Sequence, residues 1–397
     1  MTMESPLTLG THRFWKWTAL FLGILAVGKG IRTPNSWSMT QAQVDYSLGF
    51  TRRGLFGTLL KSPLHLNIAS HYAALSLFLL LLLFFLLGWL ALRSGVVEQI
   101  DEGEVLALFA SSYSVTYLAH VNGYFDIPLA ILCIVPLFVR NVGFRFIIAL
   151  ACTTVGIFIH EQFLFAFLPV MLFSFVVSGF ETASQTERRL AWGSGIALAL
   201  FAALLTVFIS LSASLTPQQS QAMAAHIAAS VDFKPDANFF SVLSRSSADN
   251  LKLMETVWRR PTFYLGQVQS ALLFFPTAAL LVYALWQVIR KRFTTRSGPI
   301  MLMALIAVLS PLCLNVVGWD KNRWSELVCL DAFIALITVC RFSSKEPVPL
   351  PRTFLRLCLI AMMLNMATGG GMLDQRQIRP FPFVQQTTQG SSSVDGH

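Results

Sequence analysis

Residues 45–54, with the sequence DYSLGFTRRG, form a polar stretch between the first two hydrophobic segments. Asp45 could act as a general base, because a carboxylate can take a proton from a hydroxyl nucleophile. Arg52 and Arg53 could bind a phosphate, since each planar guanidinium can donate to two oxygens at once. The alternative is an interfacial helix whose arginines contact lipid headgroups. The stretch therefore predicts either a site for an anion or a helix on the membrane surface.

Two further short polar segments carry candidate residues. His160 and Glu161 begin like a zinc-protease motif, but the second histidine four residues later is absent, so zinc is not supported. The pair could orient a substrate hydroxyl, bind a cation or cap the next helix. Asp126 ends the segment 122–126 and precedes Ile-Pro, which is typical of a tight turn followed by a helix start. For both segments the alternative to ligand binding is a structural role.

The segment 318–324 places Asp320 and Arg323 between two tryptophans, a residue type that is frequent at membrane–water interfaces. The two charged side chains could bind substrate, or they could only pair with each other at a helix start. Glu326 and Asp331 follow inside an apolar segment. Carboxylates are costly there, so they indicate a functional site.

Composition indicates a polytopic membrane protein. Hydrophobic residues make up 55% of the 397 residues and charged residues only 12%, and the mean hydropathy is +0.62. The net charge of +9 therefore indicates contact with membrane lipids or an anionic ligand, and not with nucleic acid. The six cysteines lie in or beside apolar segments, which favours buried thiols over disulfides or a zinc site. Motifs of nucleotide-driven enzymes are absent from the sequence.

Hydropathy predicts an all-α transmembrane bundle of about eleven spans, since one span needs about 20 apolar residues. The expected spans are 14–30, 71–92, 104–121, 126–140, 144–160, 161–180, 190–212, 263–289, 299–317, 324–340 and 353–370. They form one domain over residues 1–370, with core spans in 14–212, an outer loop at 214–262 and C-terminal spans in 263–370. Residues 371–397, rich in Gly, Gln and Ser, are expected to be an outer, partly disordered tail.

The distribution of lysine and arginine in the short loops predicts a cytoplasmic N-terminus. Basic residues lie in the loops assigned to the inner face, whereas the outer hinges around 122–126 and 160–162 have none. In this orientation the polar segments share the non-cytoplasmic face; they are 45–53, 122–126, 160–161, 214–262 and 318–324. We therefore expect an outward-facing site.

Three stretches of the outer loops have the pattern of amphipathic helices that lie on the membrane surface. Residues 217–229 and 239–258 mix apolar and polar side chains at helical spacing, and 54–68 could form a third such helix. The two long outer loops are thus expected to contain helices and not to be open coil.

This arrangement resembles the GT-C superfamily of polytopic glycosyltransferases. In that superfamily a first outer loop carries an acidic catalytic residue and an amphipathic helix, and a second long outer loop follows span seven. Asp45 with 54–68 matches the first loop, and 214–262 matches the second. The likeness covers most of the chain but is architectural, and Asp45 stands alone where several families have an acidic pair.

The resemblance implies transfer of a sugar from a polyprenyl-phosphate donor to a glycan or lipid-linked acceptor, in cell-envelope glycan or polysaccharide assembly. It further implies a multi-pass protein of the bacterial inner membrane, with Asp45 as catalytic base. A divalent metal (Mg or Mn) is left open, and no other cofactor is implied. The residues expected to bind substrate are Arg52, Arg53, Asp126, His160, Glu161, Arg259, Arg260, Asp320 and Arg323.

Other functions fit parts of the same pattern. A Wzy-like polysaccharide polymerase would use the same features. A flippase or transporter of a lipid-linked or anionic solute would instead have charges buried in mid-membrane and similar sites on both faces. A non-catalytic partner in an envelope complex is the third alternative. The one-sided distribution of polar segments favours the transferase.

Overall fold

The structure is a computed structural model that describes residues 6–369, apart from 101–102, 213–214, 246, 319 and 345. The regular elements of this part are helices, together with one isolated backbone bridge between Ile100 and Val348. The expected all-α class is therefore confirmed for the described residues. The tail expected at 371–397 lies outside them.

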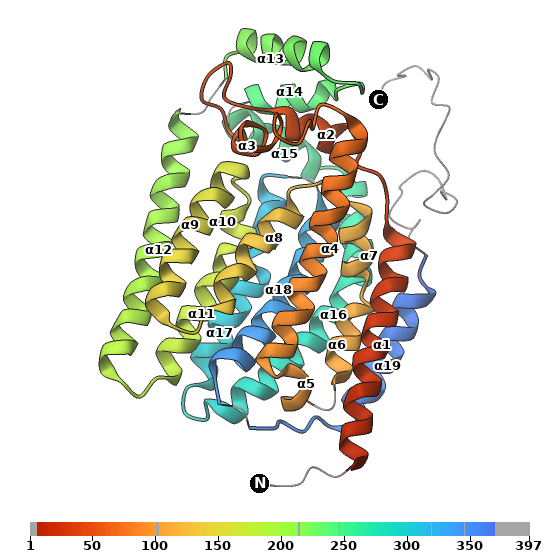
Figure 1. The fold of residues 1–397 in the computed structure, drawn as a ribbon, viewed down its shortest axis with the longest axis vertical. Helices are drawn as coiled ribbons and strands as arrows, with labels where there is room; N and C mark the ends of the chain where they lie inside the picture. Colours follow the sequence, from red (N-terminus) through yellow and green to blue (C-terminus); the bar gives the residue numbers. More distant parts are fainter. Residues whose placement is uncertain are drawn as a thin grey trace.

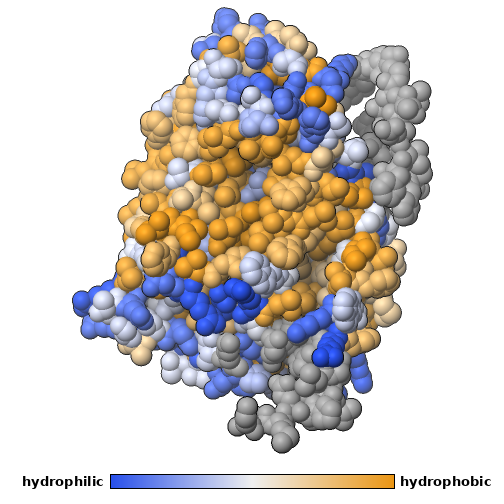
Figure 2. Space-filling view, viewed as in Figure 1, coloured by the Kyte–Doolittle hydropathy of each residue, from blue (hydrophilic) through white to orange (hydrophobic). Residues whose placement is uncertain are grey.

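Six helical segments within the described ranges are long and apolar enough to cross a membrane. They are α4 (Ala69–Ser94), α9 (Val142–Ile159), α10 with α11 (Phe163–Ala166 and Leu168–Glu181), α12 (Gln185–Ser212), α16 (Pro261–Arg292) and α17 with η3 (Ser297–Leu309 and Ser310–Val316). At 1.5 Å per residue the shortest is about 27 Å long, close to the thickness of the hydrocarbon core. Figure 2 shows an apolar belt between two more polar ends, as expected of a membrane protein.

The other helices of the bundle are shorter or more polar. They are α1 (Pro6–Gly30), α5 (Val96–Gln99), α6 (Glu104–Ala110), α7 (Tyr113–His120), α8 with η2 (Asp126–Ile134 and Val135–Phe138), α18 (Lys321–Phe342) and α19 (Arg352–Ala367). The segment 104–121, expected as one span, is interrupted between α6 and α7. The interruption is stabilised by the Ser112 hydroxyl, which accepts from the Val115 amide at 3.3 Å and caps α7.

Helix α18 lies in the centre of the bundle (Figure 1) and packs against α16, α11, α4 and α7. Every residue from Arg323 to Cys340 is buried, although three of them are the ionisable Arg323, Glu326 and Asp331. A helix with this many ionisable groups in the interior needs polar partners from its neighbours. At the N-terminal end of α18 these partners are Asp126, Asp320 and Gln162, which all contact Arg323.

Five short helices form an outer layer over one end of the bundle, at the top of Figure 1. They are α2 (Ser36–Gln43), α3 (Leu55–Leu60), α13 (Pro217–Ser230), α14 (Ala237–Ser244) and α15 (Ser247–Trp258). The helix expected at 217–229 corresponds to α13. The stretch 239–258 is divided between α14 and α15, and the helix within 54–68 is limited to α3.

The outer layer joins two loops that are far apart in the sequence. Val44 shares a small apolar core with Met223 and Phe239. The Thr40 hydroxyl accepts from the Asp236 amide at 2.8 Å, which ties α2 to the start of α14. The Asp232 carboxylate accepts from the Ala69 amide at 2.8 Å and so caps α4. The two loops therefore form one packed unit.

Candidate functional site

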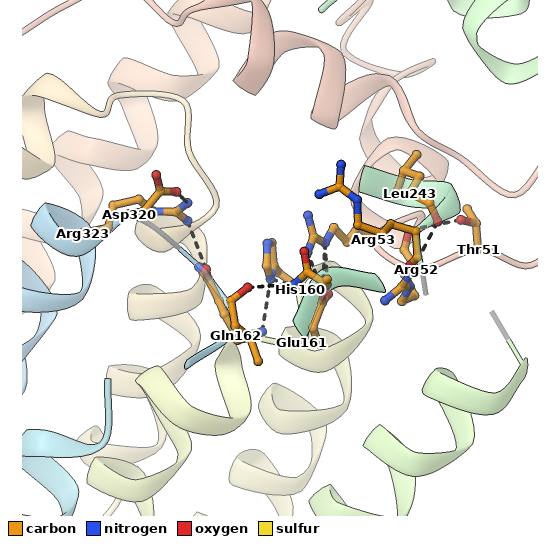
Figure 3. A network of polar contacts seen from close by, with 12 residues as sticks. Thr51, Arg52, Arg53, His160, Glu161, Gln162, Leu243, Asp320 and Arg323 are labelled. Atoms are coloured by element: carbon orange, nitrogen blue, oxygen red, sulfur yellow. Dashed lines mark hydrogen bonds and ion pairs between the residues drawn. The ribbon is translucent and has the colours of Figure 1, made fainter. Parts of the chain in front are cut away.

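The turn His160-Glu161-Gln162, between α9 and α10, links two arginine–carboxylate pairs at the end of the bundle that carries the outer layer. Figure 3 shows Glu161 directed to Arg53 on one side and Gln162 directed to Arg323 on the other. Residues from four of the expected polar segments thus meet: 45–53, 122–126, 160–161 and 318–324.

Arg323, in the first turn of α18, makes the most enclosed of these contacts. Its Nε and Nη2 donate to the two carboxylate oxygens of Asp126 at 2.8 and 3.0 Å. Nη1 donates to Asp320 at 3.1 Å, and Nη2 also donates to Gln162 at 3.0 Å. The sequence suggested Asp320 as the partner, whereas the structure gives Arg323 a bidentate contact with the buried Asp126. All three guanidinium nitrogens are therefore engaged by protein groups.

Aromatic rings add to the enclosure of Arg323. The guanidinium carbon lies 4.9 Å from the ring centroid of Tyr124 and 5.0 Å from that of Trp324. Such contacts stabilise a partly desolvated cation. Trp319, the first of the two tryptophans in the segment 318–324, is outside the described residues. The ring of Trp324 is buried beside the guanidinium, so it fixes the position of Arg323 inside the protein.

Arg53 forms the second pair and has an unusual backbone. Its Nε lies 3.1 Å from one Glu161 oxygen, and its Nη2 lies 2.5 Å from the other. Its φ is 66°, in the left-handed region that residues other than glycine seldom adopt. Such backbone strain costs about 1–3 kcal/mol and is concentrated at functional sites. Nη1 of Arg53 forms no hydrogen bond or ion pair within the described part of the chain, so this nitrogen is available to a ligand.

Arg52 connects the same stretch to the outer layer. Its Nη2 donates to the backbone carbonyl of Arg245 at 3.0 Å, just after α14. The Nη1 of Arg245 is buried and has no hydrogen-bond partner among the described residues. Arg52, Arg53 and Arg245 together carry more positive charge than Glu161 can balance. This part of the site is therefore suited to an anion.

His160 lies between the two pairs. Its Nδ1 accepts from the Gln162 amide at 3.1 Å, which leaves the proton of the neutral ring on Nε2. Burial, and then the positive charge of Arg53, hold the pKa of His160 well below its ordinary value, and Arg323 and Arg52 act in the same direction. The ring is therefore neutral and offers an Nε2–H donor at the centre of the site.

Glu161 keeps its charge in the same surroundings. Burial alone would raise the pKa of its carboxyl, but the charge of Arg53 is the strongest opposing influence and the pKa lies well below its ordinary value. An ionised Glu161 orients Arg53 and cannot donate a proton at neutral pH. Its role is therefore to position Arg53.

Asp45 has its own partners. The Nζ of Lys61 lies 2.6 Å from one carboxylate oxygen, and the Ser47 amide donates to the other at 3.0 Å. Burial raises the pKa of the Asp45 carboxyl, but the hydrogen bonds from Lys61 and Ser47 outweigh it, so the pKa is below its ordinary value. Among the described residues, Asp45 forms no hydrogen bond or ion pair with Arg53 or Glu161. Asp45 is an ionised, half-buried carboxylate in the loop that also carries Arg53.

Two of the expected binding residues lie apart from this network. Arg259 pairs with Glu255 at 2.6 Å, and both side chains are well exposed. Arg260 occupies the N-cap position of α16, makes no capping hydrogen bond with its side chain and is exposed. An exposed ion pair such as Arg259–Glu255 contributes little to the stability of the fold. The structure thus brings together Arg53, Asp126, His160, Glu161, Asp320 and Arg323, with Arg52 next to Arg53. Asp45 lies in the same loop as these two arginines and pairs with Lys61.

A divalent metal has no ready protein site in this region. Within the described ranges, no three His, Cys, Asp or Glu side chains are grouped closely enough to hold one ion. Asp126, Glu161 and Asp320 each face an arginine. The side chains present therefore do not fit a metal held by the protein alone.

A groove of about 630 Å³ opens on the side of the bundle between α16, η3 and α18. Its lining is mostly apolar and includes Trp258 and the exposed Tyr264 and Val268. Inside it, Gln267 donates to Asn315 at 2.7 Å. Ser325, two residues after Arg323, lies on its α18 edge. Side chains two residues apart on a helix face different sides, so the groove reaches α18 on another face than Arg323, and its lining contains none of the arginines of the network.

Three contributors to the site were not indicated by the sequence: Gln162, Lys61 and Arg245. Gln162 directly follows Glu161, so its place in the same hinge was a usable signal. Lys61 and Arg245 occur among ordinary polar residues of the outer loops. Only the packing of α3 and α14 brings them to Asp45 and Arg52.

The chain matches no protein-family model, no curated protein and no solved structure.

Proposed function

We propose that the protein is a membrane glycosyltransferase that uses a polyprenyl-phosphate-linked sugar on the non-cytoplasmic face. The observation that carries the proposal is Arg53. It has a left-handed backbone, a bidentate contact with Glu161 and a guanidinium nitrogen, Nη1, that forms no hydrogen bond with the described residues. Strain of this kind at a fixed cation supports a binding role.

The arginines suit the leaving group of such a reaction. When the bond from the sugar to the lipid phosphate breaks, negative charge grows on the phosphate oxygen. A fixed cation at that oxygen stabilises the transition state more than the ground state. Arg53, with Arg52 and Arg245 nearby, would bind the phosphate, and His160 could donate an Nε2–H hydrogen bond to it. Arg323 and Asp126 would hold the wall of the site.

A carboxylate must also remove the proton from the acceptor hydroxyl. Asp45 is the proposed base, because it is ionised and stands in the same loop as Arg53. Asp320 is the second candidate, because 45% of its side chain is exposed while it accepts from Arg323. Proton removal of this kind accelerates a reaction by about 10²–10⁴.

The groove beside Ser325 supports a substrate that arrives from the bilayer. A polyprenyl chain is apolar and would pack against Trp258, Tyr264 and Val268. The proposal includes the eleven-span, N-inside topology in a bacterial inner membrane, which puts the outer layer on the side where envelope glycans are assembled. The acceptor would be a glycan or a lipid-linked saccharide.

The proposal is tested by comparing a deletion strain with strains that produce the wild-type protein or the Arg53→Gln variant. Mass spectrometry of the envelope glycans should show the loss of one sugar in the deletion strain, with its lipid-linked donor accumulating. Wild-type protein should restore the sugar, and Arg53→Gln should not. Unchanged glycans would refute the proposal.

A flippase or transporter of a lipid-linked or anionic solute is the second candidate. The observation that favours it is the pair of carboxyl side chains Glu326 and Asp331 in the buried middle of α18, since such groups mark ion or proton pathways. Purified protein in liposomes distinguishes the two functions. A flippase moves a labelled lipid-linked sugar between leaflets without an acceptor, whereas a transferase consumes it only when an acceptor is present.

A further inference from the structure

Glu326 and Asp331 have no part in the proposed sugar transfer. Both lie on the central helix α18, five residues apart, and the side chains around them are buried on every side of the helix. Asp331 is 0% exposed. A carboxyl group in this position is costly unless it is paired or neutral. Apolar packing alone does not compensate this cost, so the two carboxyl groups indicate a function.

The interruption between α6 and α7 lies beside Glu326. Ser111, Ser112 and Ser114 are fully buried there, midway along a segment that could otherwise have formed one continuous span. The hydroxyl of Ser114 donates to a carboxylate oxygen of Glu326 at 2.9 Å. Interrupted helices with polar groups in the membrane interior are the usual places for coupling ions and protons. The break thus provides Glu326 with hydrogen-bonding groups where an unbroken apolar helix would provide none.

Asp331 has fewer hydrogen-bond partners than Glu326. Neither of its carboxylate oxygens has a hydrogen-bond partner among the described residues. The titratable groups that act on it are Glu326 on its own helix and the thiol of Cys133 on α8. Neither supplies a positive charge. An isolated carboxylate in such surroundings would take up a proton to avoid the loss of its hydration.

The charged groups near Glu326 do not balance a negative charge on its carboxyl group. They are Asp126 on α8, Arg323 one turn earlier on α18, and Asp331. Arg323 already donates to both oxygens of Asp126, so its charge is largely balanced. The described residues also lack a cluster of three metal-ligating side chains. The surroundings are therefore suited to a proton and not to a divalent cation.

We propose that Glu326 and Asp331 are two proton-binding groups inside the bundle, and that both exchange their protons with water. In this reaction a carboxylate takes a proton from a water-borne donor and becomes a neutral acid, and it returns the proton by the same route. Their role goes beyond the proposed sugar transfer, because that reaction needs no proton in the membrane interior. Protonation of Glu326 would also change the charge that faces Arg323, which lies one turn earlier on the same helix.

Infrared spectroscopy of the full-length protein in lipid nanodiscs tests this proposal. Protein labelled with ¹³C at either the aspartate or the glutamate carboxyl groups separates the two residues by isotope shift. We expect carbonyl bands of protonated acids at neutral pH in both samples, and these bands should shift in D₂O. Glu326→Gln should remove the glutamate band and Asp331→Asn the aspartate band. The matched control is Glu255→Gln, which changes an exposed carboxylate outside the candidate site and should leave both bands in place.

Three results would overturn the proposal. The first is the absence of acid carbonyl bands in the labelled wild-type protein, which would mean that both groups are ionised. The second is a band that does not shift in D₂O, which would mean that the protons do not exchange. The third is replacement of the acid bands by carboxylate bands on addition of sodium, which would make this a cation site. If either variant fails to fold, the spectra of the labelled wild-type protein are sufficient to test the proposal. None of these results depends on sugar transfer.

Discussion

Arg323 and Asp126 are 197 residues apart in the sequence, and yet their side chains share two hydrogen bonds of 2.8 and 3.0 Å in the interior. The contact joins the start of α18 to the start of α8. Because Gln162 contacts both residues, the turn before α10 is held in the same place. The position of His160 and Glu161 therefore depends on a pair that does not itself need to touch a substrate.

The first prediction concerns this pair. Arg323→Ala leaves the Asp126 carboxylate buried and unpaired, so we expect the free energy of unfolding to fall by about 3–5 kcal/mol. Arg323→Lys keeps the charge but cannot bind both oxygens of Asp126 in the same plane, and most of the activity should be lost. Thermal unfolding in detergent measures the first effect, and sugar transfer measures the second. An Arg323→Lys variant as active as the wild type would show that the bidentate contact is unnecessary.

The second prediction uses the backbone of Arg53. Arg53→Gly removes the guanidinium but suits a φ of 66°, so we expect a folded protein with activity reduced by at least about 10². Arg53→Ala loses the same contacts and keeps the strain, and it should be less stable than Arg53→Gly. Thermal unfolding and donor-lipid binding separate the two effects.

A matched control for Arg53 is Arg259→Gln, which breaks an exposed arginine–glutamate pair. Neither donor binding nor stability should change appreciably in this variant. If Arg259→Gln weakens donor binding as much as Arg53→Gly does, the effect is one of general surface charge, and the proposed phosphate site is wrong.

The third prediction concerns the base. Asp45→Asn removes the proton acceptor at nearly constant shape, and we expect transfer to slow by about 10²–10⁴. Lys61→Gln should have a smaller effect, because it removes the partner and leaves the carboxylate. Initial rates at saturating donor provide the comparison. Near-normal turnover by Asp45→Asn would move the role to Asp320, Asp126 or Glu161.

The fourth prediction concerns pH. Since the folded protein holds the pKa of His160 below its ordinary value, the unfolded chain takes up a proton more readily. The resulting stability is complete above the unfolded pKa of about 6.5 and is lost as the pH falls below it. We expect a loss of about 1 kcal/mol between pH ~6.5 and ~5.5. Thermal unfolding across this range should show a smaller loss in His160→Asn, and the full loss in the exposed control His226→Asn.

The fifth prediction is topological. With a cytoplasmic N-terminus and eleven spans, a reporter fused after residue 240 should be outside and one fused after residue 294 should be inside. Alkaline phosphatase and a cytoplasmic fluorescent protein report the two sides. If both fusions are on one side, the number of spans between these points is wrong.

The long apolar helices could be predicted from the sequence because their signal is local. The run from Leu77 to Leu87 has enough hydrophobicity by itself to define α4, and Thr216 with Gln219 forms a capping box that begins α13. The polar helix α2 carries no such signal. It forms because Asn35 caps it and α14 packs against it.

The site could be predicted as a set of segments but not as a set of partners. The common face of residues 45–53, 122–126, 160–161 and 318–324 follows from counting spans. Which carboxylate meets which arginine depends on the rotation of each helix, and the hydropathy pattern does not specify it. Asp320, close to Arg323 in sequence, was the expected partner, whereas the buried Asp126 makes the bidentate contact.

The capping of α4 by Asp232 has a consequence for how substrates reach the arginines. Any swing of the second outer loop away from the first would expose the start of a membrane helix and divide the apolar core around Val44 and Phe239. The proposed transferase would therefore have to admit its substrates without separating the two loops, because separation would break both the cap of α4 and this apolar core.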